Sequence, residues 1–188
     1  EYHKDALQFT KRRFRDAKET MGMLEAAMME NFTNSISPIA IQTMQMLVGD
    51  ESLQFRFVNS RTNPVAVNHT IRYDATTKQL KSNAGLIQHL TLGIKSISSS
   101  HSASEYKFWD VNAFTSARLD DAAKKYYLYI KASKTEETAE LTLSSKTIKM
   151  EEVNGYYYFL AGLLGSEYEG ERSFTSLYGF TEVLPGRI

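Results

Sequence analysis

Paired carboxylates near the C-terminus are the first residues that could do chemistry. Three of them alternate along one segment, Glu167, Glu169 and Glu171. Alternate residues of a strand share a face, and hydrolysis of a glycosidic bond needs two carboxylates roughly 5 to 10 Å apart. However, Gly170 within the segment indicates a turn, and the neighbours Glu151 and Glu152 would point to opposite faces of a strand. We therefore expect solvated charges, no catalytic pair, and a protein that is not an enzyme.

Motifs for metal, nucleophile and phosphate chemistry are absent from the sequence. The chain has no cysteine, and its four histidines show no metal-ligand spacing: His3, His69, His89 and His101. We expect His89, which stands in an apolar run, to be a hydrogen-bonded strand residue. Gly165-Ser166 lacks the glycine pattern of a serine-hydrolase motif, and no glycine-rich loop precedes a helix. The sequence thus predicts no catalytic residue, no metal site and no cofactor.

Aromatic residues are unusually frequent, with eleven tyrosines, ten phenylalanines and one tryptophan. Tyrosines fall on both faces of the segments 126–129 and 156–159, so some rings are expected to face outward. Exposed rings can stack on a sugar or be buried in a protein interface. Trp109, together with Tyr106, is the best candidate for binding a glycan. The more common alternative is that Trp109 fills the core.

Residues 4–32 are predicted to form one long helix, because they contain no proline and only one glycine. Apolar residues recur every seven positions within it, as in a coiled coil, with Thr10 and Ala17 as weak members of the stripe. At about 1.5 Å per residue the helix would be roughly 40 Å long. The residues expected to mediate oligomerisation are Leu7, Phe14, Ala17, Met21, Leu24 and Met28.

The charge balance argues against nucleic acid and anionic membranes as partners. The chain has 22 basic and 22 acidic residues, and its one basic cluster, residues 11–15, has acidic neighbours. The cluster is therefore expected to be a charged helix face that pairs across a coiled coil. The longest apolar run, residues 156–164, is shorter than the about 20 residues of a spanning helix. We expect no membrane span.

From Leu53 onward the apolar period changes from helical to two, which indicates strands. Turn-forming clusters separate the strand-like segments, which we expect at 53–57, 65–73, 86–97, 126–132, 139–143, 156–164 and 173–184. Many short strands without intervening helices indicate a mainly β fold. The prediction is an antiparallel β-sandwich, jelly-roll-like, preceded by the long helix. The expected division is a helical oligomerisation segment 1–33, a connector 34–50 and a β-sandwich domain 51–188.

Several strings resemble a family of tail-fibre or baseplate proteins of phages and prophages of gut bacteria. They are MQMLVGDESLQFRF at 44–57, KYYLYIKASK at 125–134, YEGERSF at 168–174 and YGFTEVLPGRI at 178–188. The resemblance implies a virion tail component, made in the bacterial cytoplasm, with other phage tail proteins as partners. It also implies an internal piece of a longer chain, and the absence of an initiator methionine before Glu1 agrees with this. A homotrimer is expected by analogy with such fibres.

These expectations favour a structural module of a phage or prophage tail that assembles as a homo-oligomer through its helix. Two alternatives remain open at this point. One is a carbohydrate-binding module that recognises host surface glycans through Trp109 and Tyr106. The other is a glycan-degrading enzyme, which would need a carboxylate pair in a cleft.

Overall fold

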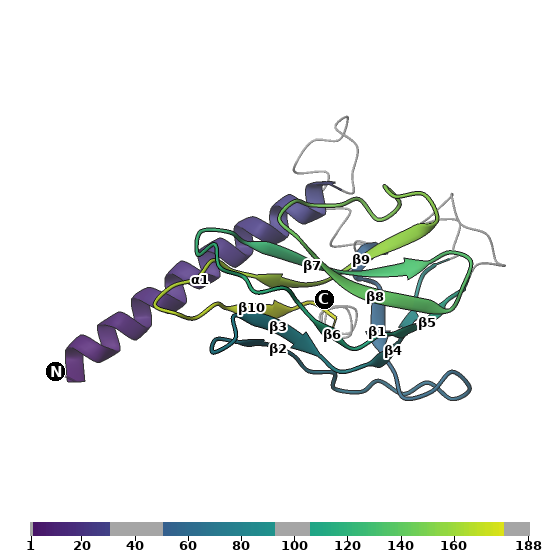
Figure 1. Cartoon of the computed structure of the whole chain (residues 1–188), viewed down its shortest axis with the longest axis horizontal. Helices are drawn as coiled ribbons and strands as arrows, with labels where there is room; N and C mark the ends of the chain where they lie inside the picture. The colour runs from purple at the N-terminus through teal and green to yellow at the C-terminus, as the bar shows by residue number, and fades with distance from the viewer. Residues whose placement is uncertain (1, 31–50, 93–105, 179–188) are drawn as a thin grey trace, which may run out of the picture.

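The chain is mainly β with one N-terminal helix (Figure 1). The computed structural model describes residues 2–30, 51–92 and 106–178, apart from the side chains of residues 2–5 and 7–9. Within these residues, helix α1 (Tyr2–Glu30) and a short 3-10 turn η1 (Glu51–Leu53) accompany ten strands. The predicted helix at 4–32 is confirmed by α1. The predicted connector at 34–50 lies outside the described residues.

The larger sheet has seven strands in the order β1-β4-β5-β8-β7-β9-β10. Their bounds are β1 Phe55–Phe57, β4 Gly85–His89, β5 Phe108–Val111, β7 Tyr126–Ser133, β8 Thr138–Ser144, β9 Tyr156–Leu164 and β10 Phe174–Ser176. The pairs are antiparallel except β5 with β8, which are parallel. The expectation of a wholly antiparallel arrangement is therefore wrong at this one junction. Between β5 and β8 the chain visits the smaller sheet and forms β7, which is long enough for a parallel return.

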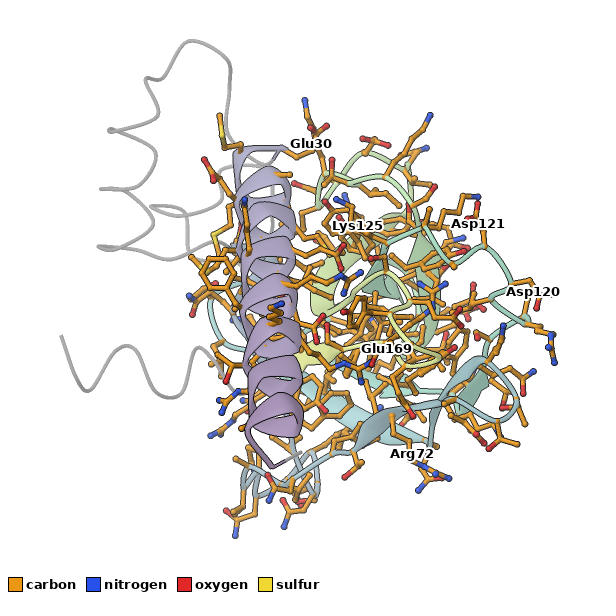
Figure 2. All side chains as sticks on the ribbon, turned by 90° about the vertical axis from the view of Figure 1, so that its left-hand side faces the viewer. Glu30, Arg72, Asp120, Asp121, Lys125 and Glu169 are labelled. Carbon is orange, nitrogen blue, oxygen red and sulfur yellow. The ribbon has the colours of Figure 1, made fainter. Side chains whose placement is uncertain are left out.

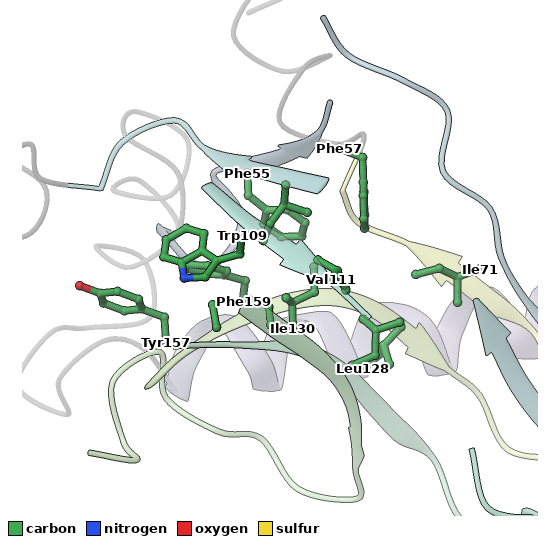
Figure 3. Close-up of a cluster of buried hydrophobic side chains, with 14 of the residues drawn as sticks. Phe55, Phe57, Ile71, Trp109, Val111, Leu128, Ile130, Tyr157 and Phe159 are labelled. Carbon is green, nitrogen blue, oxygen red and sulfur yellow. The ribbon is translucent and has the colours of Figure 1, made fainter. Parts of the chain in front are cut away.

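The smaller sheet has three antiparallel strands in the order β2-β3-β6. They are β2 (Ile71–Asp74), β3 (Gln79–Ser82) and β6 (Phe114–Thr115). Ile71 and Leu80 from this sheet join the same buried cluster as Phe57 and Leu128 from the larger sheet. The two sheets therefore share one apolar core, part of which is drawn in Figure 3.

The strands with the strongest apolar patterns are those that the sequence predicted best. The segments 126–132, 139–143 and 156–164 become β7, β8 and β9. The predicted strand at 65–73 is wrong over most of its length, because only β2 and an isolated bridge from Val58 to Ala66 form there. The short strands β3, β5 and β6 were not predicted, since two to four residues carry too little periodicity.

Both faces of the central strands β7 and β9 are buried. Leu128 and Ile130 point into the core between the sheets, whereas Tyr127, Tyr129 and the β9 residue Tyr158 lie in a second cluster with helix α1. These three tyrosines are 9%, 2% and 7% exposed. The expectation that some tyrosines of these strands face outward is therefore wrong for these three, because α1 packs on this face of the sheet, but it holds for Tyr156, which is 36% exposed.

A bulge in β9 decides which of its residues face the helix. Leu128 pairs with Gly162, and the next residue, Tyr129, pairs with Leu160, so Ala161 is the additional residue. After a bulge the alternation shifts by one position. As a result Leu160 and Leu163 both face α1, although they are three residues apart.

Candidate interaction surface on helix α1

Helix α1 docks on the larger sheet through its C-terminal half. Met23 and Ala27 are 2% and 3% exposed, and they contact the cluster that contains Tyr127, Tyr129 and Leu163. Leu24 and Met28 are partly buried against the same cluster. Figure 2 shows the helix lying along one side of the β-strands, and in Figure 1 its N-terminal end projects past them.

A polar contact, which we call the clasp, fixes the middle of the helix. Glu19 accepts hydrogen bonds from the Ser166 backbone N and from Ser166 Oγ, both at 2.7 Å. Arg15 donates to the same Oγ at 2.5 Å. A Cβ on Gly165 would lie 2.6 Å from Glu19 Oε1, so only glycine lets the carboxylate approach this closely. The clasp thus aligns Glu19 with the end of strand β9.

A tight turn that follows β9 contacts α1 through Arg12, about one helical turn before the clasp residue Arg15. Tyr168 and Glu171 bridge, and between them Glu169 and Gly170 have φ of 51° and 82°, as in a type I′ turn. Arg12 donates to the Tyr168 carbonyl at 2.7 Å and pairs with the Glu169 carboxylate at 3.1 Å. The guanidinium of Arg12 also lies 5.0 Å from the centre of the Tyr168 ring, a cation–π contact.

The opposite face of α1 carries the predicted heptad stripe. Phe14 and Met21 are 72% and 65% exposed, and Ala17 is exposed between them. Residues that are two positions apart in an α-helix are separated by about 200° around its axis. Met21 therefore points away from the face on which Met23 is buried. The stripe therefore remains accessible over Phe14, Ala17 and Met21, and its later members Leu24 and Met28 are half-buried within the chain. The side chain of Leu7 lies outside the described residues.

A cavity of about 310 Å³ lies beside the helix and the tight turn. Its lining residues are Arg12, Asp16, Tyr168, Glu171, Arg172 and Ser173. Arg172 is only 6% exposed, and it donates to the backbone carbonyls of Asp121, Lys124 and Gly165. Its guanidinium also lies near the rings of Tyr73 and Tyr126. These contacts make Arg172 a structural tie between the 121–124 loop and the end of β9.

The three alternating glutamates do not converge. Glu167 pairs with Lys78 at 3.5 Å, Glu169 pairs with Arg12, and Glu171 lines the cavity. The tight turn separates them, as Gly170 indicated. Their positions give no support to the alternative of a glycan-degrading enzyme, and the expectation of no enzymatic activity stays a prediction.

Trp109 is part of the core and offers no ring to a sugar. Its side chain is 0% exposed, its Nε1 donates to the Ser133 carbonyl at 2.7 Å, and Phe159 packs edge-on against it (Figure 3). The candidate role of Trp109 in glycan binding is therefore corrected, because stacking requires an exposed ring face. Tyr106 is 39% exposed, and without Trp109 it forms no pair of stacking rings.

The two histidines whose side chains the structure describes, His69 and His89, occupy structural positions. His89 is buried, with Nε2 2.8 Å from the Glu51 carbonyl and Nδ1 2.7 Å from the Leu92 backbone N, which confirms the predicted hydrogen-bonded strand residue. His69 stacks on Phe57 with 4.0 Å between ring centroids and lies 2.8 Å from Ser82 Oγ. Burial lowers the pKa of His69 below its usual 6.5. Among the described residues no three potential ligands gather into a metal site.

Sequence reasoning missed the clasp residues Arg15, Glu19 and Ser166. Polar residues of a helix give no periodic signal that distinguishes a docked face from a solvated one. The sequence pattern predicts that the basic cluster 11–15 pairs with another helix, whereas Arg12 contacts Tyr168, and Arg15 and Glu19 contact Ser166, within the same chain. A helix able to cross a membrane is not found in the part of the chain that the structure describes.

Comparison with known proteins gives no relative. No protein-family model, no curated protein and no solved structure matches this chain. The resemblance to phage tail proteins therefore remains a prediction. The geometry defines the class: a mainly β protein whose one α-helix among the described residues docks by one face and exposes an apolar stripe on the other.

Proposed function

We propose that this chain is a structural module that self-associates through helix α1. In this proposal the two sheets form a β-sandwich body, and α1 is the element through which chains assemble. A jelly-roll order of strands is not part of the proposal. The clasp and the buried Met23 hold α1 at a fixed angle on the body. A fixed helix can present its outer face to another helix without first paying the entropy of being ordered.

The observation that carries the proposal is the division of α1 into two apolar faces. One face, with Met23 and Ala27, satisfies the chain's own sheet. The other face, with Phe14 and Met21 at 72% and 65% exposure, has no partner within the described residues. Seven-residue spacing is the pattern by which helices pair with helices. The fold of a single chain leaves the second apolar face exposed, whereas an assembly of chains would bury it.

The biological setting is part of the same proposal. The resemblance of the segments 44–57, 125–134, 168–174 and 178–188 supports a component of a phage or prophage tail fibre or baseplate, located in the virion tail. Other tail proteins would be its partners there. The number of copies in the assembly, three by analogy with fibres, is to be measured.

Sedimentation velocity over a concentration series tests the self-association. The unmodified chain is expected to change from monomer to oligomer with increasing concentration. The double variant Phe14→Ser, Met21→Ser is expected to stay monomeric, because the substitutions remove the apolar stripe from an exposed face. Its circular dichroism and its denaturation midpoint should match those of the unmodified chain.

Met23→Ala is the matched control, two residues from Met21. It should destabilise the fold by about 2–5 kcal/mol, because it opens a cavity under the helix. A chain that stays monomeric up to high micromolar concentration would contradict the proposal. The same holds if the double variant associates as the unmodified chain does.

A further inference from the structure

The outer face of α1 has an uneven charge along its length. Lys11, Arg13 and Lys18 are exposed around Phe14 and Ala17, whereas the next exposed charge along the helix is Glu25. The acidic residues of this region face the other way: Asp16 pairs with Arg15 and Glu19 is held in the clasp. Docking on the sheet therefore leaves the stripe basic near its N-terminal end and acidic near its C-terminal end.

We propose that the occupant of this face is a second copy of α1 running antiparallel, so that two chains form a two-fold pair. The inference rests on the proposed self-association and adds the partner's direction. It replaces the threefold parallel bundle expected by analogy. Two features of the exposed face favour the antiparallel direction, the charges beside the stripe and the sizes of the residues within it.

Charges beside the stripe oppose a parallel pair. With Phe14 and Met21 at heptad position a, Lys11, Lys18 and Glu25 occupy position e, and Arg13 and Thr20 occupy position g. In a parallel coiled coil a g residue faces the partner's next e residue, so Arg13 would face Lys18 of the other chain. This repulsion occurs at every interface of a parallel dimer or trimer. Glu25 would face the uncharged Thr20 and gain nothing.

Antiparallel pairing brings opposite charges together. Position e then faces position e, and with Met21 of one helix over Ala17 of the other, Lys11 lies opposite Glu25. Two-fold symmetry makes this attraction twice. Position g faces position g, so Thr20 meets Thr20, and Arg13 lies on the side of Ala27, which brings no charge and is itself buried under its own sheet. Lys18 meets its own copy once, and it is the one repulsive contact.

Residue size favours the same direction. Position a holds large side chains, Phe14, Met21 and Met28, while position d holds the small Thr10 and Ala17 and the larger Leu24. Parallel pairing would stack Ala17 on Ala17 and leave that layer underfilled. Antiparallel pairing places the large Met21 against Ala17 and the half-buried Met28 against Thr10, while Phe14 meets Leu24. Alternation of large and small residues across an interface is what fills a core without voids.

Cysteine cross-linking tests the direction, and the chain suits it because it has no cysteine of its own. Lys11→Cys and Glu25→Cys variants, mixed under mild oxidation, are expected to form the mixed disulfide. The Lys11→Cys variant alone should not, because its two copies would lie about 21 Å apart along the antiparallel pair. The matched mixture, Arg13→Cys with Lys18→Cys, should form the mixed disulfide only if the helices are parallel.

Charge reversal gives a second measure without cross-linking. Glu25→Lys is expected to weaken association by about three- to tenfold, since two attractive contacts become repulsive. Lys11→Glu added to Glu25→Lys should restore it. Circular dichroism of each variant reports whether α1 is still folded. If Glu25→Lys has no effect on association, the proposed pairing is wrong.

The outcomes separate this inference from the proposed function. Association with the 11–25 disulfide supports both. Association with the 13–18 disulfide, or with neither, overturns the antiparallel direction and leaves self-association standing. A trimer observed by sedimentation would also overturn the two-fold antiparallel pair and leave self-association standing. A chain that remains monomeric at high concentration overturns both.

Discussion

Gly162 shows at the residue scale how one absent side chain sets the fit between strands. A Cβ on Gly162 would lie 2.4 Å from Cζ of Phe174, which packs across the β9–β10 pair. Phe174 pairs with Leu164 in the neighbouring strand, and its ring extends over the position of Gly162. The bulge in β9 brings Gly162 to this position, and no sequence pattern announced it.

Gly162→Ala is therefore expected to lower the free energy of unfolding by about 1–3 kcal/mol, since the ring or the strand must move. Gly22→Ala is the matched control. Gly22 lies in α1 with nothing within 4 Å of its added Cβ, so the same change should stabilise by about 0.5–1 kcal/mol. Chemical denaturation measures both. Equal effects of the two changes would contradict the close contact with Phe174.

His69 makes stability depend on pH. Burial lowers its pKa in the folded chain below the 6.5 of the unfolded chain, so below pH 6.5 the unfolded chain binds the proton first. Stability should be complete above pH 6.5 and fall as the pH decreases below it. His69→Gln should reduce the difference in denaturation midpoint between pH 7.5 and pH 5.5. The other histidines contribute equally to both proteins, so an unchanged difference would exclude His69 as a cause.

At the scale of elements, α1 is held by an apolar contact at one end and a polar contact in its middle. The clasp satisfies the backbone N of Ser166, a residue that is 8% exposed. A buried N–H left without an acceptor costs more than an average hydrogen bond contributes. The clasp therefore decides the angle of the helix and, with it, the direction in which the stripe points.

Glu19→Ala is expected to destabilise by about 1–3 kcal/mol and to speed amide hydrogen exchange along α1. Glu25→Ala removes a carboxylate from the exposed face of the same helix and should change stability by less than about 0.5 kcal/mol. Denaturation and hydrogen exchange of the monomer at low concentration give the comparison. Equal effects would show that the clasp adds nothing to docking.

For the whole molecule, the larger sheet lies between two apolar contacts, the smaller sheet on one face and α1 on the other. Removal of residues 1–30 would expose the face formed by Tyr127, Tyr129, Tyr158, Leu160 and Leu163. Exposed apolar patches of this kind promote aggregation. The β-strands are thus expected to depend on the helix for solubility.

The truncated protein should bind a hydrophobic dye and aggregate at concentrations where the full chain stays in solution. Removal of residues 1–9 alone is the control, because this part of α1 precedes the contacts of Arg12 with the tight turn. A soluble, dye-free protein lacking residues 1–30 would show that α1 only rests on the sheet.

The sequence by itself determined the elements whose patterns are long. Twenty-nine helical residues without proline, and the apolar runs of β7 and β9, show their periods without any knowledge of neighbours. It also determined the turn at Gly170 and the heptad stripe, because spacing alone defines both.

Tertiary structure decided everything that depends on which face meets which. Tyr127, Tyr129 and Tyr158 became buried because they lie in the cluster with α1, and Trp109 became a core residue because Tyr157 and Phe159 of β9 pack against it. The basic cluster was divided between the clasp and the outer face for the same reason. Whether a face is buried depends on the surface that packs against it. The sequence pattern shows which residues share a face, but it does not show which part of the chain covers that face.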